Sequence, residues 1–340
     1  MAEPIEVDDE EAISSANATQ GAYTRAPSIS TNPEPRSGSE ESRNSTKSLT
    51  PSSLSSPILE NSRHYTNTTY HMPADPPEAT RLTILHQSAL PLLSPRLTLT
   101  HIPPTATRIL DIGTGTADWA IAVAEAHPHA EVIATDITTS FQPATAPPNL
   151  FFELDDATQE WAYTSPFDFI HIRGLAGAFT AKQWERVYEQ AAKHLKPGGT
   201  LEVADFGEIH LECGQPDTHL QTYNHLLRTA CTALNAPYPL SLSHLLPAAF
   251  TSSNLSITKS KSFHVPLGTW DPDPAKKVAG KMALIAALEG LEAQGLRLVT
   301  RGCEGWGEEA FRGLCEGVRG EVVGGRGRVE WRVVGGRGMG

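Results

Sequence analysis

The stretch Arg108-Ile109-Leu110-Asp111-Ile112-Gly113-Thr114-Gly115-Thr116-Ala117-Asp118-Trp119-Ala120 decides the fold of this chain. It predicts a short apolar strand over 109–112, a turn through Gly113 and Gly115, and then a helix. Glycine suits such a turn because it reaches positive φ and lets a ligand lie against bare backbone. The first turn of the helix adds unpaired N–H groups. The stretch is a candidate ligand site, and a plain strand-to-helix turn is the alternative.

The residues around the glycines separate two classes of ligand. A dinucleotide fingerprint has glycine at its first, third and sixth positions, but the sixth position here is Asp118. Asp118 and Asp111 put negative charge where two phosphates would lie, which is unfavourable in a partly desolvated site. S-adenosylmethionine has no phosphate and carries a sulfonium cation, so carboxylates suit it. The loop favours a methyl donor, and an NAD(P) oxidoreductase is the weaker alternative.

Acidic residues follow at the ends of the next two predicted strands. Asp136 ends a strand over 131–136 and lies about 20 residues after Gly115, as expected of an acceptor for a ribose diol. A turn or helix-cap aspartate is the alternative for Asp136. A third strand over 151–157 ends in Asp155, Asp156 and Ala157, and one of its carboxylates is placed to accept from an adenine amino group.

Two further strands complete the predicted cofactor-binding core. A fourth strand over 167–173 carries His171 and Arg173 near its carboxyl end, and a fifth covers 200–206. A helix begins at about Ala181 and ends at the breaker Lys196-Pro197-Gly198-Gly199. Strands and helices thus alternate, which predicts right-handed crossovers and a mostly parallel sheet. The expected cofactor-binding residues are Asp111, Gly113, Thr114, Gly115, Asp136, Ile137, Asp155, Asp156, Ala157, His171 and Arg173.

No residue pattern identifies a catalytic group. His171 and His210, near the ends of the fourth and fifth strands, are the candidate bases. A packed or capping histidine is an equally good reading of His171. We expect the acceptor to contact residues 206–275, where no motif carries a chemical requirement.

The segments outside the core differ in composition and in the spacing of their apolar residues. Residues 1–63 are rich in Ser, Thr, Pro, Asn and Glu, which predicts a disordered tail with phosphorylatable Ser-Pro and Thr-Pro sites. A helix with prolines in its first turn begins at 76. Later patterns predict helices over 220–234 and 273–293, strands over 255–265 and 329–334, and a flexible end at 335–340. In the helix over 273–293 the expected core stripe is Met282, Ile285, Leu288 and Leu291.

Composition limits the partners and the compartment. The formal net charge of −12 and the pI of about 5.5 argue against nucleic acid and anionic membranes. The four cysteines lack metal-ligand spacing, and no apolar run is long enough for a membrane span. The acidic N-terminus is unlike a secretory or mitochondrial presequence. We expect a cytoplasmic protein with reduced thiols, and a nuclear location is the alternative.

Three motifs together resemble the class I S-adenosylmethionine-dependent methyltransferases, and more narrowly the fungal LaeA-like (UMTA-type) group. These are 110–116 in the glycine loop, 167–177 (FDFIHIRGLAG) and 194–199 (HLKPGG), with a late match at 290–293 (GLEA) and Thr300-Arg301. The resemblance spans about Tyr65 to Val334. It implies a Rossmann-like α/β fold, with a mostly parallel seven-stranded sheet, helices on both faces and an antiparallel last strand. The domain would cover 64–334, with a leading helical segment 64–104, the cofactor-binding core 105–206 and an acceptor-side region 207–334.

The resemblance also implies roles for individual residues. Asp111, Gly113 and Gly115 would hold the methionine part of the donor, Asp136 the ribose, and Asp156 with Ala157 the adenine. The family usually has a third glycine where this chain has Ala117, so we expect the added methyl group to crowd the ligand. The implied activity is methyl transfer from S-adenosylmethionine to a small-molecule oxygen or nitrogen. The alternative is a LaeA-like regulator that acts through protein partners, which would bind its N-terminal tail.

Overall fold

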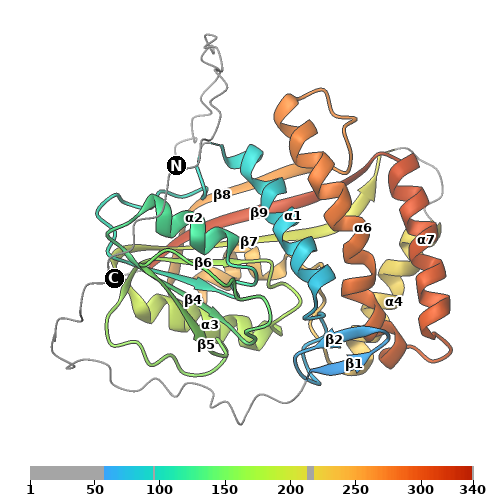
Figure 1. The fold of residues 1–340 in the computed structure, drawn as a ribbon, viewed down its shortest axis with the longest axis horizontal. Helices are drawn as coiled ribbons and strands as arrows, with labels where there is room; N and C mark the ends of the chain where they lie inside the picture. Colours follow the sequence, from blue (N-terminus) through green and yellow to red (C-terminus); the bar gives the residue numbers. More distant parts are fainter. Residues whose placement is uncertain (1–56, 95, 213–217, 339–340) are drawn as a thin grey trace, which may run out of the picture. The chain divides into compact units, whose positions relative to one another are not determined.

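The fold is known from a computed structural model that describes residues 57–94, 96–212 and 218–338 (Figure 1). Seven strands of this part of the chain form one sheet in the order β5-β4-β3-β6-β7-β9-β8. Strands β3 to β7 are parallel, whereas β9 runs antiparallel to both β7 and β8. The predicted sheet and its antiparallel last strand are confirmed. The strands are β3 (Arg108–Ile112), β4 (Glu131–Asp136), β5 (Leu150–Leu154), β6 (Phe167–Arg173), β7 (Leu195–Leu211), β8 (Leu255–Pro266) and β9 (Gly327–Gly338).

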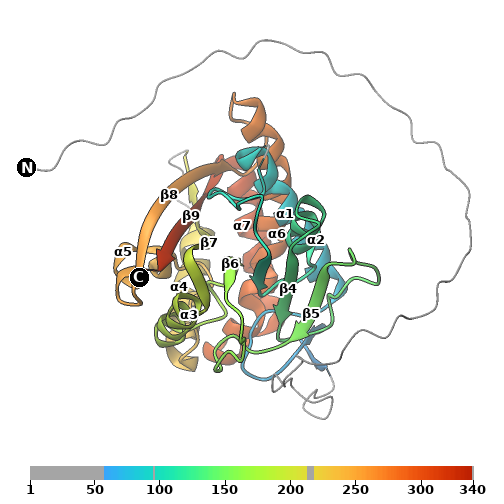
Figure 2. The ribbon, with the colours of Figure 1, turned by 90° about the vertical axis from the view of Figure 1, so that its left-hand side faces the viewer.

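Helices cover both faces of the sheet, as expected (Figure 2). Successive residues of a strand point to opposite faces, and β3 shows the consequence. Ile109 packs in the cluster of Trp119 from α2, whereas Leu110 packs in that of Trp184 from α3. The helices are α1 (Pro76–Leu93), α2 (Asp118–Ala126), α3 (Ala181–His194), α4 (Thr218–Leu234), α5 (Pro247–Thr251), α6 (Pro274–Gly302) and α7 (Glu308–Gly324), with a short 3-10 turn at Ser243–Leu245.

Parts of two segments predicted to lack regular structure form strands. Of the tail predicted over 1–63, residues 1–56 lie outside the described residues, but β1 (Ile58–Glu60) pairs with β2 (Arg63–Tyr65) in a hairpin. Its turn places Asn61 and Ser62 at positive φ, as a tight hairpin turn requires. The predicted flexible end is also wrong in part, because β9 continues to Gly338.

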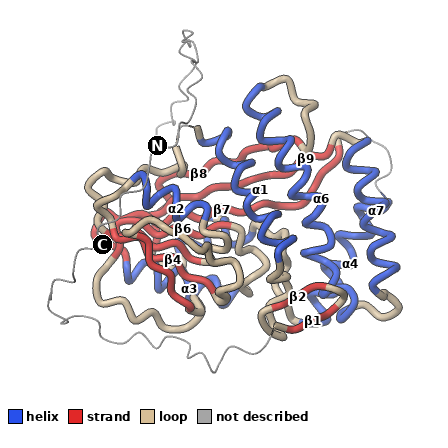
Figure 3. The backbone as a smooth tube through the Cα atoms, in the orientation of Figure 1, coloured by secondary structure: helices blue, strands red, loops and turns tan. Residues whose placement is uncertain are grey.

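Helix α6 buries only part of the expected stripe, since Leu288 and Leu291 pack in the core whereas Ile285 does not. Ile285 is 40% exposed, and up to residue 290 the buried positions are small residues: Ala279, Gly280, Ala283, Ala286 and Gly290. Small side chains let neighbouring helices approach closely, and α1 lies alongside α6 (Figure 3). Of the predicted stripe, Leu291 is fully buried. This close pair of helices forms one side of the cavity described below.

Candidate functional site

The glycine loop joins β3 to α2 in left-handed backbone. Gly113 and Gly115 have φ of +67° and +55°, values that cost glycine little. Side chains at the ends of neighbouring strands hold the loop. The Asp136 Oδ2 atom accepts from the Gly115 N–H at 2.9 Å, and the Asp111 Oδ2 atom accepts from the Thr114 hydroxyl at 2.7 Å. The carboxylates predicted for the donor therefore also fix the loop that would bind it.

Ala117 does not crowd the loop in the way we expected. It is left-handed, with φ of 61° and ψ of 14°, and it precedes α2 as its N-cap residue. Its side chain is completely buried in the core beside Trp119 and borders no cavity described below. The absence of the usual glycine thus costs backbone strain rather than space for a ligand.

Two neighbouring cavities open at the carboxyl ends of the parallel strands, and both are bordered by Tyr70, Gly113, Asp136 and Leu175. All the expected cofactor-binding residues border one or both. The first cavity is lined by Asp111, Gly113, Thr114, Gly115, Asp136, His171 and Arg173. The second is lined by Gly113, Asp136, Ile137, Asp155, Asp156 and Ala157. His210 is not brought to the site, because it is exposed on β7 opposite Arg328 and borders neither cavity.

His171 is held between an acid and an aromatic ring. Its Nδ1 atom lies 2.7 Å from the Asp111 Oδ1 atom, and both side chains are buried. The imidazole stacks on the Trp119 indole with ring centroids 3.7 Å apart and an interplanar angle of 8°. Asp111 is engaged by His171 on one oxygen and Thr114 on the other. Asp111 is therefore placed to order the site rather than to meet a ligand with a free carboxylate.

Arg173 brings a positive charge to the first cavity. Its Nη2 atom donates to the Nδ1 atom of His86 at 2.7 Å. Burial, together with the charge of Arg173, lowers the pKa of His86 to about 4, so the imidazole is neutral and can accept. Within the described residues no carboxylate forms an ion pair with Arg173. The guanidinium is thus available to an anionic group of a ligand.

Asp136 lies where the two cavities meet. Burial raises its pKa to about 6, and the backbone N–H groups of Gly115 and Thr138, which donate to its two oxygens, oppose this shift. A ligand that donates hydrogen bonds to such a carboxylate favours its ionised form and lowers its pKa.

Several residues of the site were missed by sequence reasoning. Residues within 206–275, where we expect the acceptor to bind, border the first cavity, including Phe206, Tyr223 and Leu240. The lining residues that were not predicted come from α1, α6 and the segment that follows β2: Thr66, Tyr70, Leu82, His86, Ala286, Ala287 and Gly290. The spacing of alanines and glycine along α6 was the available signal, because it marks the face that another helix approaches.

Comparisons with known proteins agree with this geometry. The methyltransferase-domain family matches residues 84–247. The chain is 35% identical to the methyltransferase pytC of Aspergillus terreus over 260 residues, which cover 75% of this chain and 78% of that protein. The chain belongs to the class I methyltransferases. S-adenosylmethionine is the methyl donor of this family, so the protein is an S-adenosylmethionine-dependent methyltransferase, as predicted.

Two further similarities concern regulators and solved structures. The methyltransferase is 31% identical over 264 residues to the secondary metabolism regulator LAE1 of Cochliobolus heterostrophus, covering 74% of this chain and 84% of that one. Among solved structures it resembles a phosphoethanolamine N-methyltransferase of Haemonchus contortus at 16% identity and a TM-score of 0.41, over 76% of this chain and 52% of that one. Among the described helices, none is long and apolar enough to cross a membrane.

Proposed function

We propose that this methyltransferase acts on an oxygen or nitrogen of a small, largely apolar molecule of fungal secondary metabolism. The observation that carries the proposal is the lining of the first cavity away from the glycine loop. It is mainly apolar, with Leu85, Phe206, Leu220, Leu240, Ala286 and Leu291 among its residues. Such a surface favours an uncharged apolar acceptor. The similarity to the methyltransferase pytC supports the methyl-transfer activity on which this proposal rests.

The acids of this region are already paired within the protein. Glu78 forms a two-point ion pair with Arg81, with separations of 2.6 and 2.8 Å. The Asp205 Oδ2 atom lies 2.9 Å from the His244 Nε2 atom, and both residues are buried. If the methyl acceptor were a lysine or arginine side chain, it would have to displace Arg81 or His244 to form an ion pair with either acid. The pairing therefore favours a neutral small molecule over a basic segment of a protein.

The proposed donor contacts follow the chemistry of each end of S-adenosylmethionine. Arg173 suits the carboxylate of the methionine part, and Asp136 suits the ribose diol. We assign the adenine end to Asp155, Asp156 and Ala157, which border the second cavity. Gly113 and Gly115 provide bare backbone between these ends. The bound donor supplies an activated methyl group, so the protein contributes mainly alignment.

His171 is the proposed base for a hydroxyl acceptor. When the Asp111 carboxylate accepts from Nδ1–H of His171, it fixes the tautomer whose Nε2 atom can accept a proton. His171 borders the first cavity together with Arg173 and Asp111. The Trp119 ring stacked on the imidazole restrains its orientation.

Transfer of labelled methyl groups tests the acceptor class. Purified protein is incubated with methyl-labelled S-adenosylmethionine and, in parallel, with an organic extract of a filamentous fungus or with histones. We expect label in the organic-soluble fraction, and none when Asp136→Ala replaces the wild type. Label confined to precipitated protein would contradict a small-molecule acceptor.

A regulatory role is the second candidate, and the similarity to LAE1 favours it. In that case the protein would act through protein partners and its cavity would serve the donor alone. Affinity purification of the full chain separates the two candidates. Recovery of a stable partner together with label in protein would support regulation, and recovery of no partner would oppose it.

A further inference from the structure

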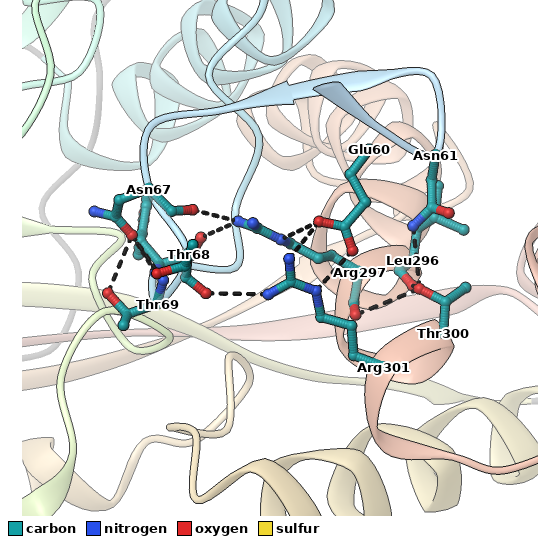
Figure 4. Close-up of polar contacts among 10 residues, drawn as sticks. Glu60, Asn61, Asn67, Thr68, Thr69, Leu296, Arg297, Thr300 and Arg301 are labelled. Atoms are coloured by element: carbon teal, nitrogen blue, oxygen red, sulfur yellow. Dashed lines mark hydrogen bonds and ion pairs between the residues drawn. The ribbon is translucent and has the colours of Figure 1, made fainter. Parts of the chain in front are cut away.

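The β1–β2 hairpin and the segment after it are fastened to the last turns of α6 (Figure 4). Arg297 of α6 is completely buried there. Its Nε atom donates to the Glu60 carboxylate at 3.0 Å, and its Nη1 atom donates to the Asn67 and Tyr70 carbonyl oxygens, both at 2.8 Å. The guanidinium carbon also lies 4.1 Å from the centre of the Tyr65 ring. One side chain thus joins the hairpin to both ends of the segment 67–70.

A second arginine repeats this arrangement one helical turn later. Arg301 forms two bonds with the Glu60 carboxylate, at 2.7 and 2.5 Å, and donates to the Thr68 carbonyl oxygen at 3.0 Å. Beside it, the Asn61 amide donates to the Thr300 hydroxyl at 3.1 Å. Burial alone would raise the pKa of Glu60, but the two arginines lower it, so the carboxylate stays charged. Figure 4 shows both guanidinium groups pointing toward the same segment.

The fastened segment is a wall of both cavities. Residues 67–71 border the second cavity, where the adenine end is assigned, and Arg301 borders it as well. Thr66, Tyr70 and Met72 border the first cavity, so Tyr70 contributes to both. The parallel strands with their glycine loop thus make only one side of the donor site. The opposite side consists of backbone whose carbonyl groups are held by arginines more than 220 residues further along the chain.

We propose that Arg297 and Arg301 are positioning residues for donor binding. They hold residues 67–70 in place, and that segment closes the donor site over the glycine loop. The guanidinium fork is required because Arg297 reaches a carboxylate and two carbonyl oxygens at once, which a single ammonium group cannot do in the same geometry. The proposal rests on the assignment of the donor site made above. It gives a role to Thr300-Arg301, a pair that the sequence singled out without a function.

The test compares lysine substitutions that keep the charge and remove the fork. Donor affinity is measured by calorimetric titration with S-adenosylhomocysteine, and the melting temperature is recorded for each protein. Arg297→Lys and Arg301→Lys are compared with Arg319→Lys, which alters an ion pair between α7 and Glu292 away from both cavities. We expect Arg297→Lys to weaken binding about tenfold or more, Arg301→Lys to weaken it less, and Arg319→Lys to change it less than about twofold.

Two further measurements separate positioning from stability. Tyr70→Ala leaves both arginines intact and should weaken binding as Arg297→Lys does. In hydrogen exchange, S-adenosylhomocysteine should protect the amides of 67–71 strongly in the wild type and much less in Arg301→Lys. The Arg301→Lys variant keeps the test decisive if Arg297→Lys does not fold. Unchanged donor affinity in both lysine variants, however far their melting temperatures fall, would overturn the proposal. A wild type that binds no S-adenosylhomocysteine would refute the donor site itself, and this inference with it.

Discussion

The Oδ1 atom of Asp111 and the Nδ1 atom of His171 lie 2.7 Å apart across the adjacent parallel strands β3 and β6. The same carboxylate accepts from the Thr114 hydroxyl in the glycine loop. One buried acid therefore orients both the loop that would hold the donor and the histidine that faces the cavity. Asp111 therefore acts on the site by orienting Thr114 and His171, and this role does not require direct contact with a sulfonium group.

Asp111→Ala is expected to weaken S-adenosylhomocysteine binding by about tenfold or more, because it leaves buried polar groups of His171 and Thr114 unpaired at about 1–3 kcal/mol. Calorimetric titration measures the affinity. Asp168→Ala is the matched control, since Asp168 likewise accepts two hydrogen bonds, in its case from the backbone N–H groups of Thr107 and Arg108, but at the amino end of its strand. The control should lose stability and keep its donor affinity. Equal losses of affinity in both variants would count against the role of Asp111.

Donor affinity should depend on pH through Asp136. Burial raises its pKa to about 6, and only the ionised carboxylate accepts both hydroxyls of a ribose. Affinity for S-adenosylhomocysteine should therefore rise as the pH increases through about 6 and level off above it. Asp136→Asn should bind weakly with no rise over the same range. Parallel profiles for the two proteins would show that another group controls the pH dependence.

The same shift predicts how stability without ligand changes with pH. The folded-state pKa lies above the ordinary aspartate value of about 4, so the stabilising contribution of Asp136 is present below that pH. It is lost as the pH rises through about 6. Denaturant unfolding of the wild type and Asp136→Asn should show the variant gaining relative stability over this interval. A constant difference between the two proteins would be inconsistent with the raised pKa.

The two glycines of the loop should differ in their tolerance of a methyl group. Both have positive φ, so alanine costs about 1–2 kcal/mol of stability at either position. At Gly113 a Cβ atom would lie 2.7 Å from both Leu175 Cδ atoms, whereas at Gly115 the nearest atom, Leu82 Cδ1, is 3.4 Å away. Leu175 borders both cavities, so Gly113→Ala should displace it and weaken donor binding further. Denaturant unfolding measures the loss of stability, and calorimetry measures the loss of donor affinity. Weaker donor binding in Gly115→Ala than in Gly113→Ala would contradict this account.

Filling the apolar part of the first cavity should block an apolar probe. Ala287 borders this cavity, whereas Ile285, two residues earlier on α6, is 40% exposed and does not. Ala287→Phe should weaken binding of the neutral fluorescent probe N-phenyl-1-naphthylamine by about tenfold, and Ile285→Phe should leave it unchanged. If both variants bind the probe like the wild type, the acceptor does not lie against α6.

The core of the fold and the proposed donor side of the site could be predicted because their signals are local. The strand before Gly113, the acid at 136 and the pair Asp155-Asp156 each combine an apolar run with a turn or an acid at its end. In a parallel sheet such strand ends meet at one edge, so local patterns are enough to bring the proposed cofactor residues together. The structure places all of these residues around the two cavities.

The remainder depends on contacts between distant segments. The strands of the β1–β2 hairpin have three residues each, too few for alternation to be visible, and the hairpin is held in place by Arg297 of α6. Up to Gly290 the buried residues of α6 are alanines and glycines, which a pattern of large apolar side chains does not reveal. Helix α7 was not predicted at all, although its buried residues Phe311, Leu314 and Val318 have helical spacing.

The central claim is that the cavities around the glycine loop bind S-adenosylmethionine through Asp136, and calorimetric titration with S-adenosylhomocysteine tests it most directly. The account predicts one binding site per chain in the wild type, and an affinity at least about tenfold weaker in Asp136→Ala, which loses charge-assisted hydrogen bonds worth about 1.5–3 kcal/mol. No heat of binding in the wild type at millimolar ligand, or equal affinity in Asp136→Ala, would contradict it.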